Sequence, residues 1–254
     1  MGFSKGFVGK LCLLSLWWSA TIATPIETGE NAKHIIKRAG NSPSDPIDAE
    51  FNTAGWENIA EEDCYVMLCL KNGNRVYQRV STAHGGDHHR TESGQSLNPF
   101  HADQLASRHT AQINQRTTSP EEFPWASTTQ GGADAVVLPA TVDEQNRQSS
   151  GINAGYAKAR VGYNQWFRIT FTEPWGKYCT ALFSQPPDFS VCDNNEQTTL
   201  FGTAGVILAN FVYYVVRSQR PYFFRHAAGP KRNQRSLEIE AVEIRQAADE
   251  RFYF

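Results

Sequence analysis

The sequence has no excess of basic residues. Its 254 residues include 24 Lys and Arg against 26 Asp and Glu, a formal net charge of −2. The first 38 residues hold five basic and two acidic residues, so residues 39–254 keep 19 basic and 24 acidic ones, a net charge of −5. A generic polyanion binder is normally basic. The composition therefore excludes that class, and any contact with nucleic acid should be local, with a metal offsetting the phosphate charge.

Cysteines are few, and the sequence lacks internal repeats, an Asn-x-Ser/Thr glycosylation site and the Cys-x-x-Cys spacing of zinc sites. Cys12 lies near the N-terminus, and Cys64, Cys69, Cys179 and Cys192 remain. In an oxidising compartment these four predict two disulfides, with three possible pairings. Cys64 and Cys69 would point to opposite faces of a strand, which disfavours a bond between them. We expect crossed or separate partners, such as a Cys179–Cys192 bond that closes a loop.

A short apolar run occurs near the N-terminus, where Lys5 and Lys10 precede residues 11–23, LCLLSLWWSATIA. This run has the length of a signal-peptide core and ends in small residues. We predict a signal peptide over 1–23 and hence a secreted protein; an uncleaved signal anchor is the alternative. The pair Lys37-Arg38 suits a proprotein convertase, so residues 24–60 are interpreted as a propeptide and flexible leader.

No apolar run reaches the roughly 20 residues that a membrane helix needs. Residues 200–216, LFGTAGVILANFVYYVV, come closest, and Arg217 and Arg220 follow them. Two glycines, a threonine, Asn210 and a β-branched and aromatic second half favour a buried strand or strand pair. A single-pass membrane anchor is the less favoured alternative. Residues 236–244, SLEIEAVEI, alternate partly like an edge strand.

The segment before the central part of the chain predicts a hairpin, a loop and a helix. Residues 63–80, DCYVMLCLKNGNRVYQRV, have two β-prone runs around an Asn-Gly turn. Residues 81–96 are expected to form a polar loop. Its three histidines are a possible metal cluster, or chance residues of a solvated loop: His84, His88 and His89. Asn98-Pro99 predicts the start of a helix through about Gln115.

The central part predicts strands separated by a loop and a helix. Residues 133–140, ADAVVLPA, indicate a short buried strand, and residues 164–172, NQWFRITFT, indicate a second strand. Between them, residues 141–151 are expected to form a polar loop and residues 152–160 a short helix. This order predicts an α+β fold with a small mixed sheet, packed helices and a C-terminal β-rich extension.

Acidic residues bracket the expected strand 133–140. Glu121 and Glu122 precede it within SPEEFPWASTTQGG, and Glu144 follows it. If the chain folds back, carboxylates from both loops and an amide would suit Mg²⁺ or Mn²⁺. A nearby histidine such as His109 would deprotonate a water for phosphodiester hydrolysis. The alternatives are solvated acidic loops and a packed histidine.

Residues 121–156 resemble the core of the NucA/NucB deoxyribonuclease family. Three elements carry the resemblance: the acid pair with an aromatic-Pro-aromatic-Ala-Ser run, a Gly-Gly loop with a strand ending in Pro-Ala, and a second acidic element. In this chain they are residues 121–128, Gly131-Gly132 with Pro139-Ala140, and Glu144-Gln145 with Gln148. The stretch 109–116, HTAQINQR, is similar to the family's upstream segment, and the resemblance spans about residues 100–175.

The resemblance implies a metal-finger-like α+β fold and a secreted, metal-dependent endonuclease that degrades DNA non-specifically. The nuclease domain would span residues 61–175, with residues 176–254 as an extension of unknown role. The implied catalytic and metal-holding acids are Glu121, Glu122 and Glu144, with His109 as general base. The implied substrate contacts are Arg108, Arg147, Gln145 and Gln148. The implied cofactor is Mg²⁺ or Mn²⁺, and no stable protein partner is implied.

Three positions depart from the family pattern. Glu121 stands where the family usually has Asp, Pro120 where it has Cys, and Ser149-Ser150 where it has two glycines. An added methylene moves a carboxylate, and catalytic geometry is sensitive to shifts of about 1 Å. The alternative function is therefore a secreted, non-catalytic effector or toxin-like interaction protein that keeps the nuclease fold.

Overall fold

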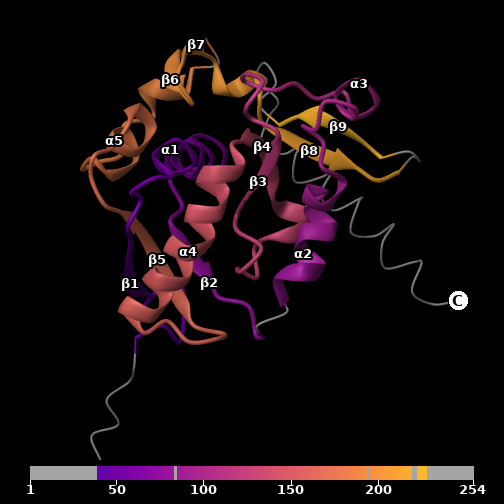
Figure 1. Ribbon diagram of the computed structural model, residues 1–254. Helices are drawn as coiled ribbons and strands as arrows, with labels where there is room; N and C mark the ends of the chain where they lie inside the picture. The colour runs from indigo at the N-terminus through magenta and orange to yellow at the C-terminus, as the bar shows by residue number, and fades with distance from the viewer. Residues whose placement is uncertain (1–38, 83–84, 194, 219–221, 228–254) are drawn as a thin grey trace, which may run out of the picture. The chain divides into compact units, whose positions relative to one another are not determined.

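The fold is built on two β-sheets and a separate β-hairpin, with helices packed around them (Figure 1). The computed structural model describes residues 39–82, 85–193, 195–218 and 222–227. The expected signal peptide, the Lys37-Arg38 pair and the expected strand 236–244 lie outside the described residues. The α+β class predicted from the sequence is confirmed.

The first sheet has the strand order β1-β5-β2. β1 (Ile47–Phe51) pairs in parallel with β5 (Trp166–Phe171), and β2 (Val76–Gln78) pairs antiparallel with it. β5 is the strand expected at 164–172, and its alternate residues are buried. β1 was not expected, because it lies within the segment interpreted as a flexible leader. Phe51 is fully buried, so this part of the segment contributes to the core.

The second sheet has the order β3-β4-β8-β9 and is antiparallel throughout. It comprises β3 (Ser119–Phe123), β4 (Val136–Ala140), β8 (Tyr213–Val216) and β9 (Phe223–His226). Every residue of β4 is buried, as expected from its continuous apolar run. β3 and β9 are the edge strands, so β3 has one side that pairs with no other strand of this sheet.

The apolar segment 200–216 folds as strands and turns, as favoured from its composition. It contains the end of β6 (Thr198–Leu200), then β7 (Thr203–Val206) and β8. Leu200, Val206 and Val215 are buried. Within the described ranges, no helix combines the length and the apolar character needed to cross a bilayer.

The hairpin predicted for residues 63–80 is wrong. Residues 57–65 form α1 (Glu57–Tyr65), which continues as a π-helical turn over Val66–Leu70, and only β2 after the Asn-Gly turn is a strand. The residues from Ile59 to Leu68 are all buried. A short run that is buried on all sides has no period that distinguishes helix from strand.

The predictions for residues 81–115 are wrong as well. Part of the expected polar loop is α2 (Gly85–Ser93), and the expected long helix shrinks to α3 (Leu105–Arg108). Asn98 adopts a left-handed backbone with φ 47°, so no helix begins at Asn98-Pro99. His109, also left-handed with φ 58°, ends α3 after one turn.

The expected loop 141–151 and short helix 152–160 form one helix, α4 (Val142–Ala159). The Thr141 hydroxyl accepts a hydrogen bond from the Glu144 N–H and caps its N-terminus. α4 lies against β1, where a Cβ added at Gly155 would lie 2.3 Å from the Phe51 ring. It also contacts β3 of the other sheet, so α4 joins the two sheets (Figure 1).

Two disulfides, Cys64–Cys179 and Cys69–Cys192, are present. The number was predicted correctly and the bonds are crossed, one of the two arrangements expected, but the pairing offered as an example, Cys179–Cys192, was wrong. Because Cys64 and Cys69 lie on a helical rather than an extended segment, both reach the same neighbouring region, α5 (Lys177–Phe183) and the 3-10 turn that ends at Cys192. The bonds fasten the expected nuclease domain to the part expected to be an extension.

Candidate active site

A polar pocket of about 480 Å³ lies along the free edge of β3. One wall is the first half of α4, and the other is the segment from Arg90 to Asn98. Side chains on successive positions of a strand point to opposite faces. Because the pocket follows an unpaired strand edge, Glu121 and Glu122 both line it, although they point to opposite faces of β3.

Glu121 points toward α4. Its carboxylate accepts hydrogen bonds from Gln145 Nε2 at 3.0 Å and from Gln148 Nε2 at 2.6 Å. The side chain is 2% exposed. Burial raises the pKa of the Glu121 carboxyl well above its usual range, and the negative charge of Asp63 raises it further. Gln145 and Gln148, which the resemblance implied as substrate contacts, thus hold this carboxylate.

Glu122 points toward α2, where the Ser93 hydroxyl donates a hydrogen bond to it. Burial raises the pKa of Glu122 to about 7. The Ser93 hydrogen bond and the positive charge of Arg90 act in the opposite direction but are smaller effects. A carboxyl with a pKa near 7 can take up and release a proton at neutral pH, which is the requirement for a general base.

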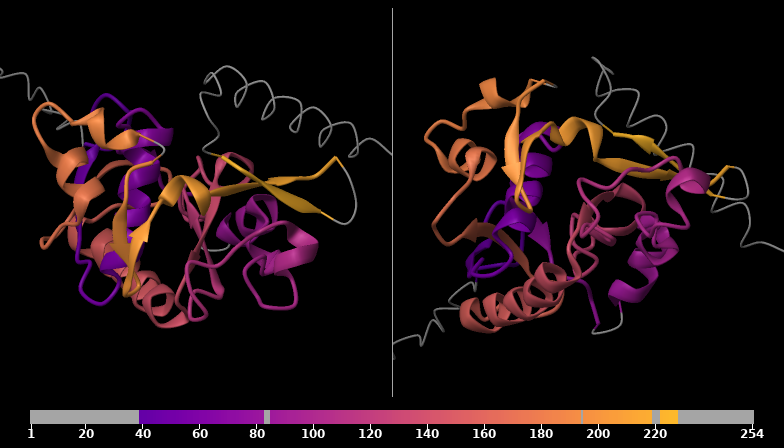
Figure 2. Two further views of the ribbon diagram at one scale, coloured as in Figure 1. Left: turned by 90° about the horizontal axis from the view of Figure 1, so that it is seen from above. Right: turned by 45° about the horizontal axis from the view of Figure 1, so that its top comes forward.

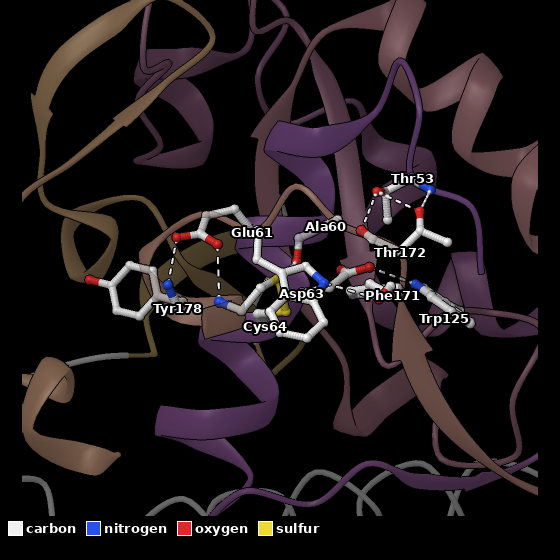
Figure 3. The surroundings of a disulfide bond; sticks show 11 residues. Thr53, Ala60, Glu61, Asp63, Cys64, Trp125, Phe171, Thr172 and Tyr178 are labelled. Atoms are coloured by element: carbon white, nitrogen blue, oxygen red, sulfur yellow. Dashed lines mark hydrogen bonds between the residues drawn. A yellow bond between two sulfur atoms is a disulfide. The ribbon is translucent and has the colours of Figure 1, made fainter. Parts of the chain in front are cut away.

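Two carboxyls of α1, Asp63 and Glu62, interact electrostatically with Glu121. Asp63 accepts a hydrogen bond from Trp125 Nε1 at 2.9 Å, so the aromatic corner that follows the acid pair is tied to it. Figure 3 shows Asp63 pointing toward Trp125 while Glu61 points the opposite way, where it accepts the N–H groups of Tyr178 and Cys179. Asp63 therefore belongs to the site, whereas Glu61 stabilises the start of α5.

Glu62 is fully buried, and neither of its oxygens has a hydrogen-bond partner within the described part of the chain. Burial raises its pKa well above the usual range, and the charges of Glu121, Asp63 and Glu144 raise it further. Glu62 thus interacts electrostatically with both Glu121 and Glu144. An unpaired buried carboxylate is costly unless a proton or a cation neutralises it.

Glu144 lies outside the β3-edge pocket. Its carboxylate accepts hydrogen bonds from Asn58 Nδ2 at 2.6 Å and from the N–H groups of Asn58 and Ile59 at the start of α1. It lines a second pocket with Asn58, Arg116 and Phe201. The structure therefore brings Glu121 and Glu122 to one pocket and places Glu144 at another.

The predicted histidine and arginines also lie elsewhere. His109 does not line the pocket; its ring lies 5.7 Å from that of Phe223 on β9. Arg108 donates to the backbone carbonyl of Tyr222. Arg147 projects from α4 across Gly55, where an added Cβ would lie 2.7 Å from its Cδ. None of the three is adjacent to the Glu121–Glu122 pair in the pocket lining.

The histidine-rich segment forms no metal cluster in its described part. On α2, His88 Nε2 pairs with Glu92 at 3.1 Å, and His89 Nδ1 lies 3.0 Å from the Ala126 carbonyl oxygen. His84 lies outside the described residues. More generally, over the ranges that the structure describes, no three His, Cys, Asp or Glu side chains are arranged to hold a metal ion.

The donor set at the β3 edge nevertheless has the chemistry of a hard-cation site. Its acidic groups are all carboxylates, and Mg²⁺ and Mn²⁺ prefer oxygen ligands. The buried Glu62 carboxyl has no hydrogen-bond partner within the described residues, and a nearby cation would stabilise its ionised form. The residues present therefore fit a divalent ion in their chemistry, with Glu121 and Glu122 as the carboxylates that face the pocket.

Residues 63–170 match the family model Deoxyribonuclease NucA/NucB. The resemblance predicted from the acid pair and its following loop is confirmed, and it begins earlier than residue 100, at Asp63. The match includes β3, β4, α4 and the upstream wall of the pocket. No curated protein matches the chain.

Sequence reasoning missed Glu62, Asp63, Ser93 and Arg90. Asp63 was assigned to the start of a hairpin, Glu62 to no element, and Arg90 and Ser93 to a polar loop. No pattern therefore placed them near Glu121 and Glu122. One signal was available: EED at residues 61–63 places three acids before a long apolar run, which is unusual for a solvated loop.

Proposed function

We propose that the chain is a secreted, metal-dependent nuclease that hydrolyses phosphodiester bonds of DNA non-specifically in the β3-edge pocket. One observation carries the proposal: adjacent buried carboxylates, one with a pKa of about 7, face an open polar pocket within a segment that matches a deoxyribonuclease family. Carboxylates held at such a cost in a structural core are typical of functional sites.

Glu122 is the general base in this proposal, in place of His109. Its carboxylate takes a proton from water while the water oxygen attacks phosphorus and the bond from phosphorus to the leaving oxygen breaks. Arg90 lines the same pocket and supplies positive charge to the phosphate. Gln145 and Gln148 fix the position of Glu121. A divalent cation held by Glu121 would supply further charge stabilisation, with Glu122 left free of the metal to act as the base.

Secretion is supported by the two disulfides, which are typical of proteins that fold in oxidising compartments. The signal-peptide pattern at residues 1–23 and the dibasic pair Lys37-Arg38 remain part of the proposal. Expression of the full chain through a secretory pathway, followed by N-terminal sequencing of the product, tests both cleavages. A product that keeps Met1 would contradict this part.

Plasmid nicking tests the activity. The full chain, purified after secretion, is incubated with supercoiled plasmid and Mg²⁺ or Mn²⁺, with EDTA as the matched control. We expect relaxed and linear DNA only with metal. Absence of nicking under every metal condition would favour the alternative, a non-catalytic interaction protein. Glu144 gives that alternative some support, because its carboxylate is hydrogen-bonded to Asn58 and Ile59 and lies outside the β3-edge pocket.

A further inference from the structure

The surface formed by α3 and β9 combines basic and aromatic side chains and lies outside the pocket. We define the α3–β9 surface as Arg108, His109, Tyr222, Phe223 and Arg225. α3 and β9 lie side by side in Figures 1 and 2, and Arg108 donates to the Tyr222 carbonyl between them. Segments separated by more than a hundred residues thus meet there.

The side chains of β9 alternate between the core and this surface. Phe224 is buried and packs with Phe100 and Val215. Phe223 and Arg225 therefore point to the opposite face. Phe223 is half-buried and Arg225 is exposed, and the Arg225 guanidinium carbon lies 5.6 Å from the centre of the Phe223 ring. His109 approaches the same ring, so three flat groups with π character lie together.

The two segments that contain α3 and β9 carry basic residues but no acidic ones. Residues 104–120, which contain α3, include no Asp or Glu, and neither do residues 197–237, which contain β9. Among the described residues, Arg108 and Arg225 are the basic side chains assigned to this surface. In a chain of net negative charge, they attract a phosphate backbone.

One short segment runs from the pocket to β9. Gly94 lies against β8 and β9, since an added Cβ would be 2.9 Å from Phe224 and 3.0 Å from Val215. The residues that follow it, Gln95, Ser96 and Asn98, line the pocket. Gly94 thus meets the Phe224 face of β9, and a strand of nucleic acid that leaves the pocket along this segment reaches the α3–β9 surface by passing around β9, the edge strand of the sheet.

We propose that the α3–β9 surface binds single-stranded DNA outside the cleavage pocket. Arg108 and Arg225 contact phosphates, and the exposed part of Phe223 stacks on a base. Arginine with an accessible aromatic ring is the combination that single-strand binding uses, because every base has a π face. The inference rests on the proposed function for its substrate, and it assigns a role to residues 222–227, which lie outside the family match.

The experiment measures binding without cleavage. The full chain is titrated into a fluorescently labelled oligothymidine of about 20 nucleotides, several times the site size of a small single-strand binding fold, in EDTA and at several salt concentrations. Variants are Arg225→Gln, Arg108→Gln with Arg225→Gln, and Phe223→Leu. Arg168→Gln, on β5 and paired with Asp48, is the matched control. Melting temperatures establish that each variant is folded. If the double variant does not fold, the result for the single variant Arg225→Gln decides.

We expect each lost phosphate contact to reduce the slope of log K against log salt by about 0.7. We expect Phe223→Leu to weaken binding by about fivefold to a hundredfold with an unchanged slope. The control should bind like the unaltered chain. Equal affinities and slopes in the Arg225→Gln variant and the unaltered chain would overturn the proposal, as would absence of binding by the unaltered chain.

The outcome separates this inference from the proposed function. Metal-dependent nicking with unaltered binding in all variants would leave the nuclease intact and overturn the docking site. Binding that depends on Arg225 and Phe223, in a chain that nicks no DNA, would support the docking site and contradict the catalytic proposal.

Discussion

At the residue scale, the distinctive feature is a group of carboxyls removed from water. Glu62, Asp63, Glu121 and Glu122 are all at most 4% exposed. Only part of their hydrogen-bonding capacity is used, and both Glu62 oxygens are without a partner within the described residues. Such an arrangement lowers the free energy of unfolding relative to a neutral core. The proposed chemistry at the pocket gives this costly arrangement a role.

The rate of DNA cleavage should depend on the ionisation of Glu122. Because the base must be deprotonated, kcat/KM should rise with pH and reach a plateau above the pKa of Glu122, which is about 7 without metal and is lowered by a cation at Glu121. Arg90 lowers that pKa, so Arg90→Gln should move the midpoint to higher pH. The measurement is the pH-rate profile of both proteins at fixed metal concentration, with Arg168→Gln as the control. A midpoint that does not move in Arg90→Gln would show that Glu122 is not the titrating group.

The free energy of unfolding should fall as the pH rises. Carboxyls with a raised pKa keep their protons in the folded state after the unfolded chain has lost them, near pH 4.5 for Glu. Stability is therefore fully present below that pH and decreases above it, by about 1.4 kcal/mol per pH unit for each such group. Glu62→Gln should reduce this slope and stabilise the protein at pH 8.

Denaturant unfolding at pH 5 and pH 8 in EDTA tests the Glu62 prediction. Glu50→Gln, an exposed residue of β1 paired with Lys158, is the control and should leave the difference between the two pH values unchanged. An equal pH difference in Glu62→Gln and the unaltered chain would mean that Glu62 is not a source of the pH dependence.

At the element scale, strands were predictable where their pattern was complete. β4 is an uninterrupted apolar run, β5 alternates, and β8 lies in a β-branched and aromatic run, and all three were located from sequence. α1 and α2 were missed for two different reasons. α1 is buried on every side and shows no amphipathic period, and α2 is so polar and rich in histidine and glycine that it resembles a loop.

The site was predictable in part for the same reason. The acid pair, its Phe-Pro-Trp corner and the glutamines of α4 form a local pattern, and the structure brings Glu121 together with Gln145 and Gln148. The location of Glu144 and His109 depends on tertiary contacts that no local pattern contains. The Glu144 side chain turns toward the start of α1, and His109 follows the left-handed end of α3.

α4 should not tolerate a methyl group at Gly155. In an exposed helix, Gly→Ala raises the free energy of unfolding by about 1 kcal/mol. Here the added Cβ would lie 2.3 Å from the buried Phe51 ring, so overpacking should lower it by about 1–3 kcal/mol instead. Chemical denaturation of Gly155→Ala, with the exposed neighbour Asn153→Ala as control, gives the sign. Stabilisation of Gly155→Ala would contradict the close packing of α4 on β1.

At the scale of the whole molecule, the disulfides join the expected nuclease domain, residues 61–175, to the expected extension, residues 176–254. Both bonds run from the segment α1 to Leu70, at the start of the family match, to residues 179–192 beyond its end. Glu61 reinforces this junction through the N–H groups at the start of α5. The segment around α5 is therefore part of the support of the site rather than a separate attachment.

Removal of one disulfide should lower the free energy of unfolding substantially. Cys64 and Cys179 are separated by 115 residues, and a cross-link over so long a loop restricts the unfolded chain by about 3–5 kcal/mol. The double variant Cys64→Ser with Cys179→Ser should show this loss in denaturant unfolding. Reductant should then destabilise the variant less than the unaltered chain, because the variant has lost this bond already. An unchanged midpoint would contradict the pairing.

The central claim is that the pocket at the free edge of β3 hydrolyses DNA with Glu122 as the base. The most direct test is the single-turnover rate of plasmid nicking at saturating metal for Glu122→Gln, compared with Glu50→Gln and the unaltered chain. Glutamine keeps the size of the side chain and an oxygen that can accept the Ser93 hydrogen bond. We predict a rate lower by about 10²–10⁴-fold for Glu122→Gln alone. Nicking by Glu122→Gln at the unaltered rate would contradict the claim.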